Sequence, residues 1–237
     1  MIVLKRRNIV IATVLALTAI TLILCCGALA KTGVNATGSG VKVVLDAGHG
    51  GIDGGVSGIT TSARESDINL AVVKKLEAYL KDAGIATVLT RSSDAGLYGA
   101  VSSTLKRRDM EKRREIILNA EPTLVVSVHM NYYPNSSRRG GQVFYKAGDA
   151  SSEKLALCLQ NNLNAIYTDV KDYSPLTGDY YVLNCTEVPS VIAECGFLSN
   201  PTDERLLTDE EFQSELAYSL FRGIIGYLAE SSFNYFG

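Results

Sequence analysis

The fold of this chain is decided by an apolar run that ends in a glycine-rich turn, Val41-Lys42-Val43-Val44-Leu45-Asp46-Ala47-Gly48-His49-Gly50-Gly51. A short apolar run bounded by glycine predicts a buried β-strand, here over residues 41–46. A second apolar run also leads into a histidine, Leu124-Val125-Val126-Ser127-Val128-His129-Met130-Asn131. The two histidines of the chain, His49 and His129, both follow predicted strands, and α/β folds place their chemistry at the carboxyl ends of strands.

Strand-like runs and amphipathic helices alternate from residue 41 onward. We expect further strands over 85–90, 124–129, 141–146 at the sheet margin, 180–183 and 190–194, and helices over 67–83, 105–120, 151–167 and 208–230. Thr208, with Glu211 three residues on, predicts a capping box for the last helix. This alternation predicts a three-layer α/β/α fold with a mainly parallel, mixed central sheet of about six strands.

The N-terminus differs from the rest in composition. Lys5-Arg6-Arg7 precede an uncharged run from Ile9 to Ala30, which is long enough to cross a bilayer as a helix. The positive-inside rule then places the rest of the chain outside the cytoplasm. The length favours a retained anchor, although Ala28-Leu29-Ala30 offers a cleavage site. We expect a signal or anchor over 1–31, a linker over 32–40, the folded domain over 41–232 and a tail over 233–237.

The net charge and the cysteine count each limit the interpretation of the chain. The formal net charge is −2, and a basic face of the kind that binds nucleic acid is not indicated. Cys158, Cys185 and Cys195 lie beyond the N-terminal segment, and an odd number cannot pair fully within one chain. A Cys185–Cys195 disulfide stays open, but buried free thiols are favoured.

Four residues are candidates for a hydrolytic metal site. Catalytic zinc usually takes three ligands drawn from histidine and acidic oxygen, with water in the fourth position. His49 and His129 supply two, and Glu65, at the start of the first predicted helix, can reach back over the first strand to supply the third. Glu194 ends an apolar strand, a costly position for a charge unless it is used or paired, and is the candidate base.

Each of these residues also has a purely structural interpretation. His49 alone could be a hydrogen-bonded loop residue, and His129 a satisfied core histidine. Glu65 could be a helix N-terminal acid, and Glu194 the partner of a structural arginine. The joint placement of the four favours the metal site. A Cys195 nucleophile is disfavoured because it leaves one histidine and Glu65 without roles, and the glycine-rich turn lacks the lysine and Ser/Thr of a phosphate-binding loop.

Four stretches resemble, in order, the signatures of zinc-dependent N-acetylmuramoyl-L-alanine amidases, the peptidoglycan amidases of the Amidase_3 type. They are Leu45-Asp46-Ala47-Gly48-His49-Gly50-Gly51, Glu65-Ser66-Asp67-Ile68-Asn69-Leu70, Ser127-Val128-His129-Met130-Asn131 and Glu194-Cys195-Gly196-Phe197-Leu198-Ser199-Asn200. The resemblance runs from about residue 41 to 228. It implies that His49, Glu65 and His129 hold zinc and that Glu194 is the catalytic acid/base.

The resemblance also implies the reaction and its setting. The bond cleaved would be the amide between the lactyl group of N-acetylmuramic acid and L-alanine, with peptidoglycan as partner and an extracytoplasmic location, membrane-anchored or secreted to the cell wall. With its short length, its N-terminal membrane segment and its lack of an added wall-binding repeat, the chain most resembles the germination-specific (CwlD-type) amidases of spore formers. A membrane contact through the N-terminal segment and an unknown protein activator are further possible partners. A zinc peptidase acting within the stem peptide and a non-catalytic wall-binding module stay as alternatives.

Other positions follow from the same resemblance. Thr90-Arg91, and Arg114 with Asn119, stand where the family carries scaffold residues. The family usually has proline in place of Ala47 and a small residue in place of Tyr132, and neither departure removes a ligand. The charged loop Asn135–Arg139, with Arg138 and Arg139, could contact carboxylates of the stem peptide, but a solvated loop is favoured.

Overall fold

The structure, a computed structural model, describes residues 40–100 and 102–233. The predicted N-terminal segment over 1–31, all but Gly40 of the predicted linker, and residues 234–237 of the predicted tail lie outside the described residues. Residues 1–39 and 40–237 form separate units, and the fold below is that of the second. Among the described helices, none has both the length and the apolar character that a membrane span requires.

A six-stranded sheet forms the middle layer, in the order β2-β1-β3-β6-β4-β5. The strands are β1 (Lys42–Ala47), β2 (Ala86–Leu89), β3 (Leu124–Asn131), β4 (Gln142–Tyr145), β5 (Leu176–Thr177) and β6 (Ser190–Phe197). β4 runs antiparallel to β6, and every other neighbouring pair is parallel. The predicted mixed, mainly parallel sheet is confirmed.

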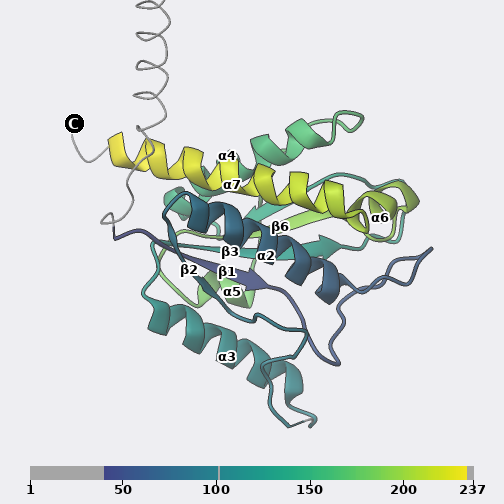
Figure 1. The fold of residues 1–237 in the computed structure, drawn as a ribbon, viewed down its shortest axis with the longest axis horizontal. Coiled ribbons are helices and arrows are strands. Elements are labelled where there is room, and N and C mark those ends of the chain that lie inside the picture. Colours follow the sequence, from purple (N-terminus) through teal and green to yellow (C-terminus); the bar gives the residue numbers. More distant parts are fainter. Residues whose placement is uncertain (1–39, 101, 234–237) are drawn as a thin grey trace, which may run out of the picture. The chain divides into compact units, whose positions relative to one another are not determined.

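Helices cover both faces of this sheet. They are α2 (Glu65–Asp82), α3 (Leu105–Ala120), α4 (Ala150–Ile166), α5 (Tyr181–Asn184), α6 (Pro201–Leu207) and α7 (Glu210–Phe233). α2, α4 and α7 pack together over one face, and α3 and α5 lie on the other (Figure 1). Each face has its own cluster of buried apolar side chains, so the three-layer α/β/α arrangement is confirmed.

The two layers of helices differ in what they bury. α2 presents an apolar stripe in which Val72 and Leu76 are fully buried. α3 instead turns Asp109 and Arg113 inward beside Ile117, at a spacing of four residues. A polar inner face on a helix is costly unless its charges are paired, and the pairing lies beneath the site described below.

Three predictions about elements are wrong, and two short elements were not predicted. The segment predicted as a strand over 180–183 is mostly the short helix α5, because the consecutive residues Val182 and Leu183 are both buried in one cluster, whereas a strand would send them to opposite faces. β4 is not at the sheet margin, since β5, which was not predicted, lies outside it. The helix α6 was also not predicted.

The capping box at Thr208 is the third wrong prediction. Thr208 ends α6, and its hydroxyl donates to the carbonyl oxygen of Glu204 at 2.8 Å. The side chain of Asp209 instead accepts the backbone N–H of Phe212 at 2.9 Å at the start of α7. The prediction failed because α6 ends at Leu207 and α7 begins at Glu210. Two residues with capping side chains therefore lie between two helices, and only Asp209 caps the start of α7.

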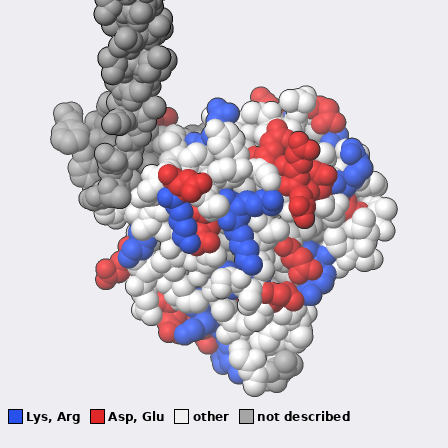
Figure 2. Space-filling view, in the orientation of Figure 1, with Lys and Arg blue, Asp and Glu red and all other residues white. Residues whose placement is uncertain are grey.

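The surface over α2 and α7 carries both signs of charge. Figure 2 shows lysine and arginine side chains interleaved with acidic ones across this face. Ion pairs such as Lys81 with Glu77 at 2.7 Å account for part of the interleaving.

Candidate metal centre

His49 leaves the carboxyl end of β1 in a conformation that brings its ring against β3. Its φ is +60°, in the left-handed region, and Gly50 and Gly51 also have positive φ values. Gly48 lies so close to β3 that a Cβ there would come within 2.1 Å of the His129 imidazole. The two imidazole rings meet edge to face, with their centroids 5.1 Å apart.

Glu65 begins α2 and points into the same space, with only 2% of its surface exposed. Its Oε2 accepts the backbone N–H of Val56 at 2.9 Å, and its Oε1 accepts the backbone N–H of Met130 at 3.2 Å. These bonds fix the carboxylate between the loop after β1 and the end of β3. Oε1 is then 2.9 Å from Nδ1 of His129 and 3.3 Å from Nε2 of His49.

The three predicted ligands therefore converge from three elements. One nitrogen or oxygen atom from each of His49, Glu65 and His129 lies within 4.8 Å of the other two. Two imidazoles and one glutamate are the donor set of one common class of catalytic zinc site. The three residues form a candidate metal site, and both their geometry and their chemistry fit a divalent ion of this kind.

The charges in the cluster support one another. Burial raises the pKa of Glu65, but hydrogen bonds with His129 and His49 outweigh it and hold that pKa well below its ordinary range. Burial lowers the pKa of His49, whereas its contacts with Glu65 and Asp53 raise it to about 9. The carboxylate thus stays ionised, which is the form that binds a metal.

Arginine side chains clamp the backbone of the loop that carries His49. Arg91 donates to the carbonyl oxygens of Ala47 and Gly48, each at 2.9 Å. Arg113 donates to the carbonyl of Ala47 at 2.8 Å and to that of His49 at 2.6 Å. These bonds satisfy carbonyl oxygens at and just after the end of β1, and that of Gly48 also accepts the side-chain N–H of Asn69 at 3.1 Å. The predicted scaffold role of Arg91 is confirmed.

Arg113, rather than Arg114, is the arginine of α3 that serves this site. Arg113 is buried and pairs with Asp46 and, at 2.7 Å, with Asp109. Arg114 and Asn119 are exposed, so the scaffold role predicted for them is wrong. The reason is helical register, since Asp109 and Arg113 share the inward face and the next residue is turned about 100° away.

Asp46 anchors this network from within β1. It accepts the hydroxyls of Thr90 at 2.6 Å and Ser127 at 2.5 Å, besides its pairing with Arg113. Burial raises the pKa of Asp46, but the Arg113 charge and the two hydroxyl hydrogen bonds outweigh burial and bring the pKa down to about 2. The loop of His49 is therefore held over an ionised, fully paired carboxylate.

Glu194 faces the cluster from β6, opposite His129 in the strand register. Its Oε2 is buried and has no hydrogen-bond partner in the described part of the chain. Burial raises the pKa of Glu194, His129 and His49 lower it, and Glu65 raises it, with a net value of about 7. A carboxyl group in this state can either take up or release a proton near neutral pH.

Sequence reasoning missed Asp53. Its Oδ1 lies 3.0 Å from Nδ1 of His49, the ring nitrogen that faces away from Glu65, and also accepts the backbone N–H of Gly55 at 3.1 Å. A carboxylate on the outer nitrogen of a ligand histidine fixes the tautomer and the orientation of the ring. The available signal was an acid four residues after His49 in a stretch otherwise made of glycine and an apolar residue.

The cysteines do not form a reactive centre in the described residues. Cys158, Cys185 and Cys195 are free thiols, so the favoured prediction for Cys185 and Cys195 is confirmed. Burial and the neighbouring Glu194 raise the pKa of the Cys195 thiol well above its ordinary value. A fully buried, protonated thiol is a poor nucleophile.

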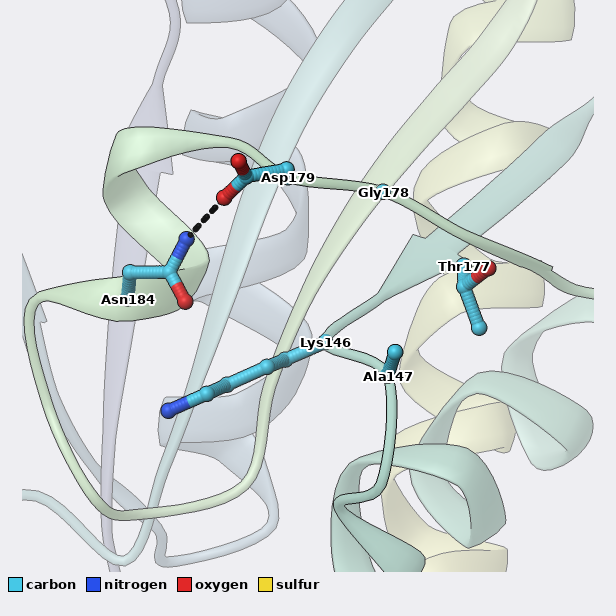
Figure 3. Close-up of a pocket in the computed structure, with 6 residues that line it drawn as sticks. All are labelled: Lys146, Ala147, Thr177, Gly178, Asp179 and Asn184. Carbon is cyan, nitrogen blue, oxygen red and sulfur yellow. Dashed lines mark hydrogen bonds between the residues drawn. The ribbon is translucent and has the colours of Figure 1, made fainter.

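A hollow of about 370 Å³ lies elsewhere, toward the amino end of β6. Its lining residues are Lys146, Ala147, Thr177, Gly178, Asp179 and Asn184 (Figure 3). The side chain of Asn184 donates to Oδ1 of Asp179 at 2.8 Å. None of the four predicted site residues lines this hollow.

Comparison with known proteins agrees with the geometry. Residues 43–226 match the family model Amidase_3, N-acetylmuramoyl-L-alanine amidase. The germination-specific N-acetylmuramoyl-L-alanine amidase of Bacillus subtilis is 34% identical over 196 residues, 81% of each chain. The structure of the CwlD amidase from Clostridioides difficile, in complex with the GerS lipoprotein, is 36% identical, with a TM-score of 0.77 over 80% of this chain and 98% of that one.

A third similar protein is also an amidase of this kind. The catalytic domain of CwlV, an N-acetylmuramoyl-L-alanine amidase from Bacillus (Paenibacillus) polymyxa var. colistinus, is 32% identical, with a TM-score of 0.69 over 80% of this chain and 98% of that one. The segment that the family model matches holds all four predicted site residues. The chain belongs to the Amidase_3 family and is an N-acetylmuramoyl-L-alanine amidase that acts on peptidoglycan.

Proposed function

We propose that His49, Glu65 and His129 hold a zinc ion and that Glu194 is the catalytic acid/base of this amidase. The observation that carries the proposal is the convergence of three ligand atoms within 4.8 Å from the ends of β1 and β3 and the start of α2. The donor set supports zinc in particular, because two histidines and one glutamate leave a coordination position open for water or substrate.

The chemistry divides between the ion and the protein. Zinc, when bound, would polarise the scissile carbonyl and lower the pKa of a water molecule to about 7. Glu194 would take the proton of the attacking water and return it to the nitrogen of the departing L-alanine. The buried oxygen of Glu194 without a partner, and its pKa of about 7, support this proton transfer. Asp53 would hold the His49 ring in place.

The bond broken is tested by the products. Purified muropeptides digested by the full-length protein should give free stem peptides that begin with L-alanine and glycan that keeps an intact lactyl carboxyl group. Mass analysis of the two fractions distinguishes this result from that of a zinc peptidase. Fragments cut within the stem peptide, with L-alanine still on the glycan, would refute the proposed cleavage.

The role of Glu194 has its own test. Glu194→Gln keeps the size of the side chain but removes the proton acceptor, so hydrolysis should fall by at least about a hundredfold. Zinc content should stay near one ion per chain, because Glu194 is outside the ligand set. Unchanged turnover would contradict the assigned role. A biological effect on the cell wall that persists in the inactive variant would instead favour the non-catalytic wall-binding module.

The setting of the reaction is proposed from sequence and likeness. The substrate lies outside the cytoplasm, and the basic and apolar character of residues 1–31 supports a segment that exports residues 41–232 as the catalytic domain. Intact-mass measurement of the protein from membrane and supernatant distinguishes a retained anchor from a cleaved signal. A full-length mass only in the membrane fraction would establish the anchor.

A germination role and a protein partner are proposed on the same basis. The relative from Bacillus subtilis is named germination-specific, and the related CwlD structure contains the GerS lipoprotein. We expect spores that lack this chain to keep stem peptides on their cortex glycan, which muropeptide analysis of the spores measures. An unchanged muropeptide profile would remove the germination role.

A further inference from the structure

Two adjacent arginines follow β3, and only one of them is neutralised. Arg139 pairs with Asp203 through Nε at 2.9 Å and with Asp169 through a terminal nitrogen at 2.6 Å. Arg138 forms no ion pair with any described residue, and no described group accepts a hydrogen bond from its guanidinium. Its positive charge is therefore available to a ligand.

Aromatic rings hold the Arg138 guanidinium in place. Its central carbon lies 5.2 Å from the ring centroid of Tyr173, 5.8 Å from that of Phe197 and 5.9 Å from that of Tyr133. Phe197 is only 3% exposed, so at least one wall of this cage belongs to the rigid core. Cation–π contacts of this kind restrain a guanidinium without using its N–H donors. A restrained donor loses less entropy when it binds.

The cage lies at the same edge of the sheet as the metal centre, because its loop follows β3, which carries His129, and is bonded to residues just after β6, which carries Glu194. The backbone N–H of Tyr133 donates to Oγ of Ser199 at 2.9 Å, and that of Gly140 donates to Asp203 at 2.8 Å. Phe197 follows Glu194 by three residues on β6, a span of about 10 Å at roughly 3.3 Å per residue. An extended peptide of about three residues covers the same distance.

We propose that Arg138 is a specificity-determining residue that binds a carboxylate of the stem peptide on the leaving side of the scissile amide. The inference rests on the proposed function, which places that amide between the metal centre and Glu194. Stem peptides carry free carboxylates within a few residues of the bond, and a planar guanidinium binds a carboxylate through two parallel hydrogen bonds. The aromatic cage and the absence of an internal acidic partner both fit this ligand.

The test compares two muropeptides that differ only in whether the stem-peptide carboxyls are free or amidated. The full-length protein should prefer the free acid. Arg138→Met, which keeps an apolar side chain in the cage, should raise KM for the free acid about ten- to a hundredfold with kcat within about twofold, and should leave the amidated substrate within about threefold. Arg138→Lys should retain part of the preference, because a point charge remains without the fork.

The controls separate this role from others. Arg114→Met removes an exposed arginine from α3 and should change neither substrate. Calorimetry of the isolated stem peptide, free or amidated, gives a readout that needs no turnover, and Arg138→Met should weaken only the free-acid complex by at least about tenfold.

Equal losses on both substrates and peptides would show that Arg138 is merely structural, and no loss on either would show that it binds nothing; both results overturn the proposal. Failure of the proposed function would appear differently, as no stem peptide released from either muropeptide by the unaltered protein. The calorimetric comparison would then still decide the role of Arg138.

Discussion

Removing the Arg113 side chain should destabilise the domain strongly, and the exposed Arg114 beside it provides a matched control. In Arg113→Met the carboxylates of Asp46 and Asp109 lose their buried cation, and the carbonyl groups of Ala47 and His49 lose donors. Taking one partner from a buried ion pair costs about 3–5 kcal/mol. Arg114→Met should cost less than about 0.5 kcal/mol, since that side chain is exposed.

The pKa of Asp46 determines how the difference in unfolding free energy between the unaltered protein and Arg113→Met depends on pH. Its pKa is about 2 in the fold against an ordinary 3.8, so ionised Asp46 contributes about 2 kcal/mol above pH 3.8, and this contribution is lost as pH falls through 2. Without Arg113, burial dominates and raises the pKa of Asp46 above 3.8. The stability gap between the unaltered protein and Arg113→Met should therefore narrow by at least about 1 kcal/mol between pH 6 and pH 3.

Urea unfolding of the metal-free protein, followed by far-ultraviolet circular dichroism at both pH values, measures these quantities. Metal-free samples are needed because zinc would add its own linkage to the apparent stability. A stability of Arg113→Met within 1 kcal/mol of that of Arg114→Met at pH 6 would refute the network. A gap that widens toward pH 3 would refute the assigned ionisation of Asp46.

Two further predictions concern the metal centre. Asp53→Asn keeps the shape of the side chain but removes the carboxylate from Nδ1 of His49, so zinc affinity measured by chelator competition should fall about ten- to a hundredfold; a change below twofold would show that Asp53 does not orient the ring. Gly48→Ala places a Cβ within 2.1 Å of the His129 imidazole and should abolish zinc binding while circular dichroism stays unchanged, whereas Gly226→Ala, with nothing within 4 Å, should bind zinc normally. Normal zinc binding by Gly48→Ala would show that His129 can move away at no cost.

The main elements of the fold could be predicted because their signals are local. The apolar runs that form β1, β3 and β6 are bounded by turns, and α2 carries an uninterrupted apolar stripe. β5 could not be predicted, since it has only two residues, both exposed, and exists through its pairing with β4. α5 depends on which neighbours bury Val182 and Leu183, which no local pattern specifies.

In the candidate site too, some features could be predicted from the sequence and others could not. The positions of His49 and His129 at strand ends could be predicted from sequence, because parallel strands bring their carboxyl ends to one edge of the sheet. Which arginine of α3 turns inward depends on the rotation of that helix about its axis, and one residue separates the buried Arg113 from the exposed Arg114. The contact of Asp53 with His49 depends on the positive φ values of the intervening loop, which sequence alone did not give.

The most direct test of the metal centre is the zinc content of His129→Ala, set beside that of Asn131→Ala two residues along the same strand. Elemental analysis of the purified full-length proteins should find about one zinc per chain in Asn131→Ala and almost none in His129→Ala, since two remaining ligands hold zinc poorly. Full zinc occupancy in His129→Ala would contradict the ligand set on which the account depends.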